Sequence, residues 1–221
     1  MSRNSDLLAS FRAFFLSGIG VFFFAIAIAH GQISQGGEPL RWGLPLELDD
    51  MSSHRYDAPE QDWDLIQAQD EIGDQYKDIP YRFGIEIETD INVLEEGLAY
   101  TDEDDNHVIF YEVNCEYATS VSMIFDQFHL PKGAELFVWN AERTEFLGSF
   151  NHKNNKEWGT FALGLVHGSS AILELQLRAG VQQDVQMNIG TVVYGYRSVL
   201  RNELQAAIHR GPFGNSGNCN I

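Results

Sequence analysis

The residues able to do chemistry are spread widely along this chain of 221 residues, which has seven histidines, two cysteines and 32 acidic residues. A serine hydrolase needs a nucleophile, a base and an orienting acid, and local signatures such as G-x-S-x-G often locate them. The sequence contains no such signature. His129, in "FDQFHLPKG", comes just before a turn, so we interpret it as a strand-end side chain and not as a base. We therefore assign no catalytic residue.

Metal binding is the next chemistry that the residue types suggest. The run "TDEDDN", residues 101–106, offers carboxylate oxygens of the kind that calcium prefers. It lacks the spacing of an EF-hand loop, so we expect a solvated hairpin tip, with a calcium site as the alternative. Two cysteines and scattered histidines give no paired spacing for zinc. We therefore predict no metal site and no cofactor.

The N-terminus predicts export. Arg3 and Arg12 precede an apolar run from Ala13 to Ala29, and small residues suited to cleavage follow. This pattern indicates a secretory signal peptide over residues 1–31. A signal anchor is the alternative, because such a run approaches the roughly 20 residues that span a bilayer. We expect a secreted or cell-surface protein with no membrane attachment after cleavage.

The net charge limits the classes of possible partner, and the cysteine count limits the disulfide bonds. A formal net charge of −18 repels phosphate backbones and anionic lipids, so we expect no nucleic-acid partner. Two cysteines exclude a disulfide-built scaffold. In an oxidising compartment Cys115 and Cys219 could form one bond, or Cys219 could pair with a residue outside this chain.

Alternating apolar residues predict the fold. Residues 32–79 are acidic and lack a sustained period, although Trp63 and Ile66 could belong to a short helix. From residue 80 to residue 197 the period is two, with turn signals between the segments. The predicted strands are "FGIEIETDI", "HVIFYEV", "SVSMIFD", "AELFVWN", "GTFALG", "AILELQLR" and "VQMNIGTVVYGY", the last with a bulge at Gly190. Seven to nine such strands predict an all-β protein, an antiparallel two-sheet β-sandwich or jelly roll.

Residues 198–210 predict a short amphipathic helix. Ser198 is a suitable N-cap, and Leu200, Leu204 and Ile208 are spaced four apart. Gly211 and Pro212 would end the helix.

Four large aromatic residues form a candidate sugar-stacking platform: Phe137, Trp139, Trp158 and Tyr194. We expect most of them in the core instead, because aromatic side chains dominate sandwich interiors.

The stretch "FDQFHLPKGAELFVWNAERTEFLGSFNHKNNKEWG", followed by "ILELQL" and "IGTVVYGYR", resembles the N-terminal non-catalytic region of secreted trypsin-like serine peptidases of the lysyl endopeptidase type. The resemblance covers about residue 79 to the end of the chain. The opening "QISQGGEPL" is similar to the start of exported proteins from Bacteroidetes-like bacteria. The matching residues are Phe128, Leu130, Pro131, Gly133, Ala134, Asn140, Gly148, Phe150, Asn154, Asn155, Lys156, Gly190, Val192, Gly195, Tyr196 and Arg197.

The resemblance also suggests an interpretation of the last residues of the chain, 211–221. "GNSGNCN", from Gly214 to Asn220, is similar to the start of the trypsin-like domain in that family, whose cysteine usually pairs within the domain. Residues 211–221 would then be the beginning of a peptidase domain whose catalytic His, Asp and Ser lie beyond Ile221. Cleavage between Arg210 and Gly211 would release it. The chain departs from the family at Cys115, which has no counterpart, and at Arg210, where a lysine-specific parent would present lysine.

Two functions follow as hypotheses. The first is a non-catalytic pro- or accessory region that contacts its own downstream peptidase domain, with no activity of its own. The alternative is an exported β-sandwich module that binds a glycan or a protein. An enzyme in its own right is a third possibility with no visible catalytic set.

Overall fold

The computed structural model describes residues 33–40, 42, 51–101 and 103–198. Four sequence predictions lie outside these residues: the signal peptide over residues 1–31, the helix after Ser198, the processing bond between Arg210 and Gly211, and the state of Cys219. No helix within the described ranges has the length and apolar character needed to cross a membrane.

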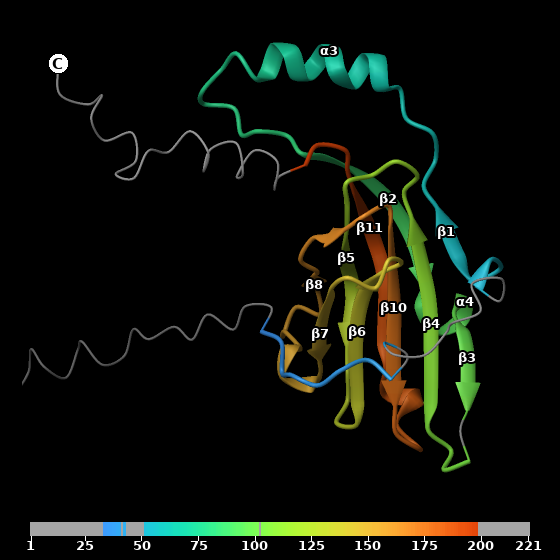
Figure 1. The fold of residues 1–221 in the computed structure, drawn as a ribbon. Coiled ribbons are helices and arrows are strands. Elements are labelled where there is room, and N and C mark those ends of the chain that lie inside the picture. Colours follow the sequence, from blue (N-terminus) through green and yellow to red (C-terminus); the bar gives the residue numbers. More distant parts are fainter. Residues whose placement is uncertain (1–32, 41, 43–50, 102, 199–221) are drawn as a thin grey trace, which may run out of the picture. The chain divides into compact units, whose positions relative to one another are not determined.

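Two β-sheets form the body of the described structure (Figure 1). The first sheet has the order β1-β4-β10-β6-β7, with β3 also paired to β4, and its strands are β1 (Arg55–Asp57), β3 (Leu98–Thr101), β4 (His107–Asn114), β6 (Ala134–Asn140), β7 (Phe146–Phe150) and β10 (Ser170–Leu177). The second sheet has the order β2-β11-β5-β8, with β9 also paired to β5, and its strands are β2 (Gly84–Asn92), β5 (Ser120–His129), β8 (Phe161–Ala162), β9 (Val166–His167) and β11 (Gln186–Gly195). The predicted all-β two-sheet sandwich is confirmed.

The main core lies between the two sheets, as the period-two pattern predicts. Val121, Met123 and Phe125 alternate along β5 and are all fully buried. Leu173 and Leu175 of β10 belong to the same cluster. Burying one such side chain stabilises the fold by roughly 1.5–3 kcal/mol, so this layer supplies much of the driving force for folding.

The predicted bulge at Gly190 is present. The register of β11 against both β2 and β5 shifts between Ile189 and Thr191. A Cβ atom at Gly190 would lie 2.8 Å from the side chain of Asp126, so glycine is the residue that allows this close approach.

The outer face of the first sheet is also buried, which the alternation did not predict. Phe110, Trp139 and Ile172 lie on this face and form a second apolar cluster with Met51. All four side chains are fully buried. The first sheet is therefore apolar on both faces, and its outer face needs a cover.

Residues 33–40, here called the N-terminal strap, contact this outer face and the β7 edge (Figure 1). The backbone of the strap pairs with Ser149: Gln35 donates to Ser149 at 2.9 Å, and Ser149 donates to Gly36 at 3.1 Å. Leu40 N donates to the buried carboxylate of Glu174 at 2.7 Å. The strap is thus part of the folded unit, although the acidic segment to which it belongs shows no strand pattern.

Some elements differ from the sequence-based expectation. β1 pairs in parallel with β4, whereas all other pairs are antiparallel, and β1, β3, β7 and β9 were not predicted. The helix suggested by Trp63 and Ile66 is present as α3 (Trp63–Gly73), where Asp62 caps the N-terminus by accepting from Leu65 N at 3.0 Å. The remaining helical turns are α4 (Val93–Glu96), η1 (His152–Asn154) and η2 (Gln182–Asp184).

Substitution of Asn140 tests how the β6–β7 turn is held. Asn140 is 3% exposed, and its Oδ1 accepts from Thr144 N at 2.9 Å and Glu145 N at 3.1 Å. Asn140→Ala leaves these donors without that acceptor and should lower the free energy of unfolding by about 2–3 kcal/mol. Urea titration of the full chain measures this loss. Gln183→Ala, in the exposed η2 turn, should change it by less than about 0.5 kcal/mol; equal effects would contradict the role of Asn140.

Candidate functional site

No hydrolase residue is assigned from the sequence, and among the described residues two histidines lie close to a carboxylate. His107 Nε2 is 3.9 Å from Asp105 Oδ1, beyond hydrogen-bond distance, so His167 is the histidine that a carboxylate could orient. His167 Nδ1 lies 2.8 Å and 2.9 Å from the two carboxylate oxygens of Glu145. Within the described ranges no serine or threonine hydroxyl is recorded in contact with His167 Nε2. The pair therefore has a base and an orienting acid without a nucleophile, and it fastens β9 to the β6–β7 turn.

The other residues singled out from the sequence lie where structural roles explain them. His129 is the last residue of β5. Residues 103–106 lie between the antiparallel strands β3 and β4, as expected for a hairpin tip. The described residues contain no group of three His, Cys, Asp or Glu side chains arranged to hold a metal. Cys115 is fully buried and forms no disulfide with a described residue.

The four aromatic residues do not form one platform. Phe137, Trp139 and Tyr194 are buried, which confirms the expectation of core positions. Trp158 is 71% exposed, so the expectation of a core position is wrong for this residue. It lies in the loop between η1 and β8.

An aromatic groove lies instead between α3 and the C-terminal end of β11. The ring of Trp63 packs against Tyr194 and Tyr196, with centroid distances of 5.2 Å and 5.7 Å. The groove has a volume of about 660 Å³. Its lining residues are Trp63, Ile66, Gln67, Asp70, Glu71, Asp74, Tyr117, Tyr194, Tyr196 and Arg197. We call this the α3 groove.

Charged hydrogen bonds hold α3 over the groove. Asp70 is the one buried residue of α3, and its carboxylate lies 2.7 Å from Arg82 Nη2. The Tyr196 hydroxyl donates to the other oxygen of Asp70 at 2.6 Å. Burial and this hydrogen bond both raise the pKa of Tyr196, so the phenol remains a neutral donor.

A second ion pair fixes the C-terminal end of α3. Arg197 pairs with Asp74, donating from Nη1 to Oδ1 at 3.2 Å, and its guanidinium lies 4.2 Å from the centre of the Tyr81 ring. The hydrogen bond from Arg197 lowers the pKa of Asp74. Since Asp70 and Asp74 are both paired with arginine, the groove offers apolar and stacking surface more than reactive carboxylates.

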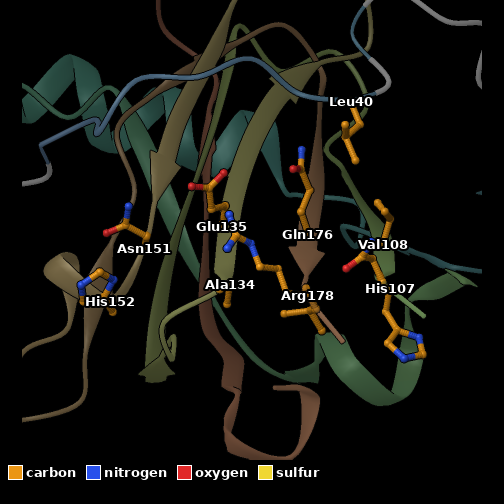
Figure 2. Close-up of a pocket in the computed structure, with 12 residues that line it drawn as sticks. Leu40, His107, Val108, Ala134, Glu135, Asn151, His152, Gln176 and Arg178 are labelled. Atoms are coloured by element: carbon orange, nitrogen blue, oxygen red, sulfur yellow. The ribbon is translucent and has the colours of Figure 1, made fainter. Parts of the chain in front are cut away.

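A second pocket lies at the other end of the sandwich, on the outer face of the first sheet (Figure 2). Its volume is about 480 Å³. Figure 2 shows Glu135, Gln176 and Arg178 in the middle of the pocket, with His152 on one side and His107 on the other. Its lining residues are Leu40, Asn106, His107, Val108, Gly133, Ala134, Glu135, Asn151, His152, Gln176, Leu177 and Arg178. We call this the sheet-end pocket.

Neither site was found from the sequence. The groove joins Trp63 and Asp70 of the acidic segment to Tyr196 and Arg197, more than 100 residues later. Its only sequence signal is the weak helix at Trp63, because nothing local shows that this helix packs on the last strand. The sheet-end pocket combines the ends of three strands, which only the sheet order brings together.

No family model and no solved structure matches the chain.

The ion pair between Asp74 and Arg197 predicts an acid-sensitive attachment of α3. A carboxyl whose pKa is lower in the folded state stabilises the fold above its ordinary pKa, and the stabilisation is lost as the pH falls through the lowered value. Asp74→Asn should therefore lower the unfolding temperature at pH 7. The difference from the wild type should shrink as the pH falls from about 4 towards 2. Asp78→Asn, which removes a carboxylate without an ion pair to any described residue, is the control; a pH-independent effect of Asp74→Asn would contradict the linkage.

The environment of Cys115 predicts an unreactive thiol. Burial raises the pKa of Cys115 to about 12, so the thiolate that reacts with alkylating agents is almost absent at pH 8. In a Cys219→Ser variant, the native chain should gain no carbamidomethyl mass with iodoacetamide, and the guanidinium-unfolded chain should gain one. Rapid labelling of the native variant would show that the thiol is accessible.

Proposed function

We propose that this chain is the non-catalytic N-terminal region of an exported trypsin-like serine endopeptidase, similar to the lysyl endopeptidase type, and that it acts by contact with the peptidase domain that follows it. The proposal rests on the sequence resemblance, and one feature of the structure carries the contact: an exposed apolar surface beside the place where the described chain ends at Ser198. The chain by itself hydrolyses no peptide.

The residues that carry the resemblance shape the sandwich. Gly133 has a φ of 98°, which favours glycine at the β5–β6 turn. Asn155 holds this turn from the side: its Oδ1 accepts from Leu130 N and its Nδ2 donates to Leu130 O, both at 2.9 Å. Gly190 forms the β11 bulge. The residues that carry the resemblance therefore have structural roles in turns and in a bulge. Such roles support a non-catalytic scaffold region.

The contact surface is formed by α3 and the loop after it, and we define the α3 surface as Leu65, Ile72, Tyr76 and Ile79. Leu65 and Ile72 are 54% and 62% exposed and lie seven positions apart, so they share one side of the helix. Trp63 and Asp70 occupy the side that faces the sandwich. The helix thus has apolar residues on its outer side as well, and an exposed apolar patch of this kind marks an interaction site.

The position of this surface suits a domain attached in the same chain. Tyr196 and Arg197 line the α3 groove, and the chain continues beyond Ser198 from there. A domain tethered at this point has an effective concentration in the millimolar range, so a modest apolar interface is sufficient to hold it.

We expect the reading frame of the gene to continue past the codon for Ile221 and to encode the separated His, Asp and Ser motifs of a trypsin-like domain. The full product should cleave peptides after basic residues, and a serine-directed inhibitor should abolish this activity. A stop codon after Ile221 would exclude the peptidase role and leave the alternative, a stand-alone exported binding module.

Substitutions on the α3 surface test the contact within the full-length protein. Leu65→Glu with Ile72→Glu should lower the yield of active peptidase by about tenfold, because charge replaces the buried part of the interface. The unfolding temperature of the sandwich should stay unchanged, since both side chains are exposed. Gln183→Glu, on the η2 turn, is the matched surface control. Normal yield from the double variant would place the contact elsewhere.

A further inference from the structure

Positive charge is concentrated at the end of the sandwich opposite the α3 groove. The chain has four lysines, and three of them, Lys132, Lys153 and Lys156, lie in the β5–β6 turn and in the segment after β7. Arg178 follows β10 at the same end. For a chain with a formal net charge of −18, this is an exceptional local gathering of bases.

Recorded contacts join these segments into one surface. The side chain of Asn155 bonds to both backbone groups of Leu130, which brings Lys156 next to the turn that contains Lys132. Arg178 N donates to Gly133 O at 2.9 Å, so Arg178 lies against the same turn. None of Lys132, Lys153 and Arg178 forms an ion pair with a described residue.

An exposed tryptophan lies beside these bases. Trp158 is two residues after Lys156 and 71% exposed, and its ring contacts no aromatic ring of the described residues. Gly159 O accepts from Phe128 N at 2.7 Å, which fixes this loop to the end of β5. A flat apolar ring that the fold leaves in solvent is suited to stacking on a ligand.

The sheet-end pocket extends the same surface over the outer face of the first sheet. His152 of η1 lines the pocket together with Arg178 (Figure 2). Glu135 and Gln176, paired across β6 and β10, form its floor with outward side chains. The pocket therefore offers a guanidinium, an imidazole, an amide and a carboxylate, groups that bind hydroxyls and carboxylates.

We propose that this end of the sandwich, formed by Lys132, Lys153, Lys156, Trp158, Arg178 and the sheet-end pocket, binds an anionic polysaccharide built of hexuronic acid units. The C–H face of a sugar ring stacks on the Trp158 indole. The uronate carboxylates pair with the lysines and Arg178, and ring hydroxyls bond to Glu135, Gln176 and His152. His152 and Trp158 are six residues apart, so up to about 20 Å of chain separates them, a span that can accommodate several sugar units.

The chemistry favours a polysaccharide over other anionic polymers. Glu135 and Glu157 lie among the bases, and a phosphodiester backbone has no donor to satisfy them, whereas sugar hydroxyls donate to carboxylates. The neighbouring sheet-end pocket carries polar and charged groups beside its apolar residues, and these groups suit the hydroxyls and carboxylates of a sugar chain. The negative charge elsewhere on the chain is screened beyond about 8 Å at physiological ionic strength.

Affinity electrophoresis of the purified full chain in gels containing polygalacturonate tests the proposal. We expect retardation by polygalacturonate that 0.5 M NaCl weakens, and none by the neutral glucan pullulan. The triple variant Lys132→Gln, Lys153→Gln, Lys156→Gln should lose about tenfold in affinity, because it removes three charges that pair with uronate carboxylates and each such pair at the surface is weak. Trp158→Ala should lose about fivefold and Trp158→Phe less than about twofold, because phenylalanine keeps a stacking face.

Lys77→Gln is the matched control, because it removes the remaining lysine, next to the α3 surface, and should leave binding unchanged. All variants should unfold at the wild-type temperature, since the altered side chains lie at the surface. The proposal is overturned if polygalacturonate does not retard the chain, if poly-glutamate binds equally well, or if Lys77→Gln weakens binding as much as the triple variant. It does not depend on the proposed peptidase role.

Discussion

Burial of both faces of the first sheet is the constraint on which the rest of the structure depends. Leu173 and Leu175 of β10 face the core between the sheets, while Ile172 of the same strand faces outward beside Trp139 and Phe110. A sheet of this kind is unstable with one face in water, because the outer cluster would expose several large apolar side chains. The N-terminal strap and Met51 meet this need. The strap is held at its edge by Ser149 and at its end by Glu174, so the acidic N-terminal segment contributes to the fold it precedes.

Attachment of α3 follows a different physical rule. The helix buries one residue, Asp70, and is held mainly by bonds from Arg82 and Tyr196 and by the pair between Asp74 and Arg197. These directional polar contacts add to the packing of Trp63 on Tyr194 and Tyr196. The apolar residues Leu65 and Ile72 are left on the outer side. The arrangement suits the contact role that we propose, because the exposed apolar residues are separate from the bonds that hold the helix.

The two ends of β5 have opposite chemistry. Tyr117, just before the strand, lines the aromatic and acidic α3 groove, and His129, at its end, lies beside Asn155 and the lysines. Ten residues of strand separate the ends by about 33 Å, several times the screening length at physiological ionic strength. One sandwich can therefore present two independent surfaces, one for a domain in the same chain and one for an anionic polymer.

The sequence by itself determined the secondary structure wherever alternation was strong. Seven strands, the Gly190 bulge and the two-sheet class follow from period-two patterns, because each strand with a buried face repeats every two residues. Short strands such as β1 and β9 were not predicted, since two or three residues are too few to show an alternating pattern. The packing of the N-terminal strap on the sandwich was not predicted, because the strap pairs with Ser149 through its backbone, and any sequence can make such bonds. Only the tertiary structure decided that Trp63 and Asp70 meet Tyr196, that Trp158 remains in solvent, and that three lysines share one end. Those placements depend on the order of the strands in the sheets and on the course of the loops. Local sequence patterns carry no information about either.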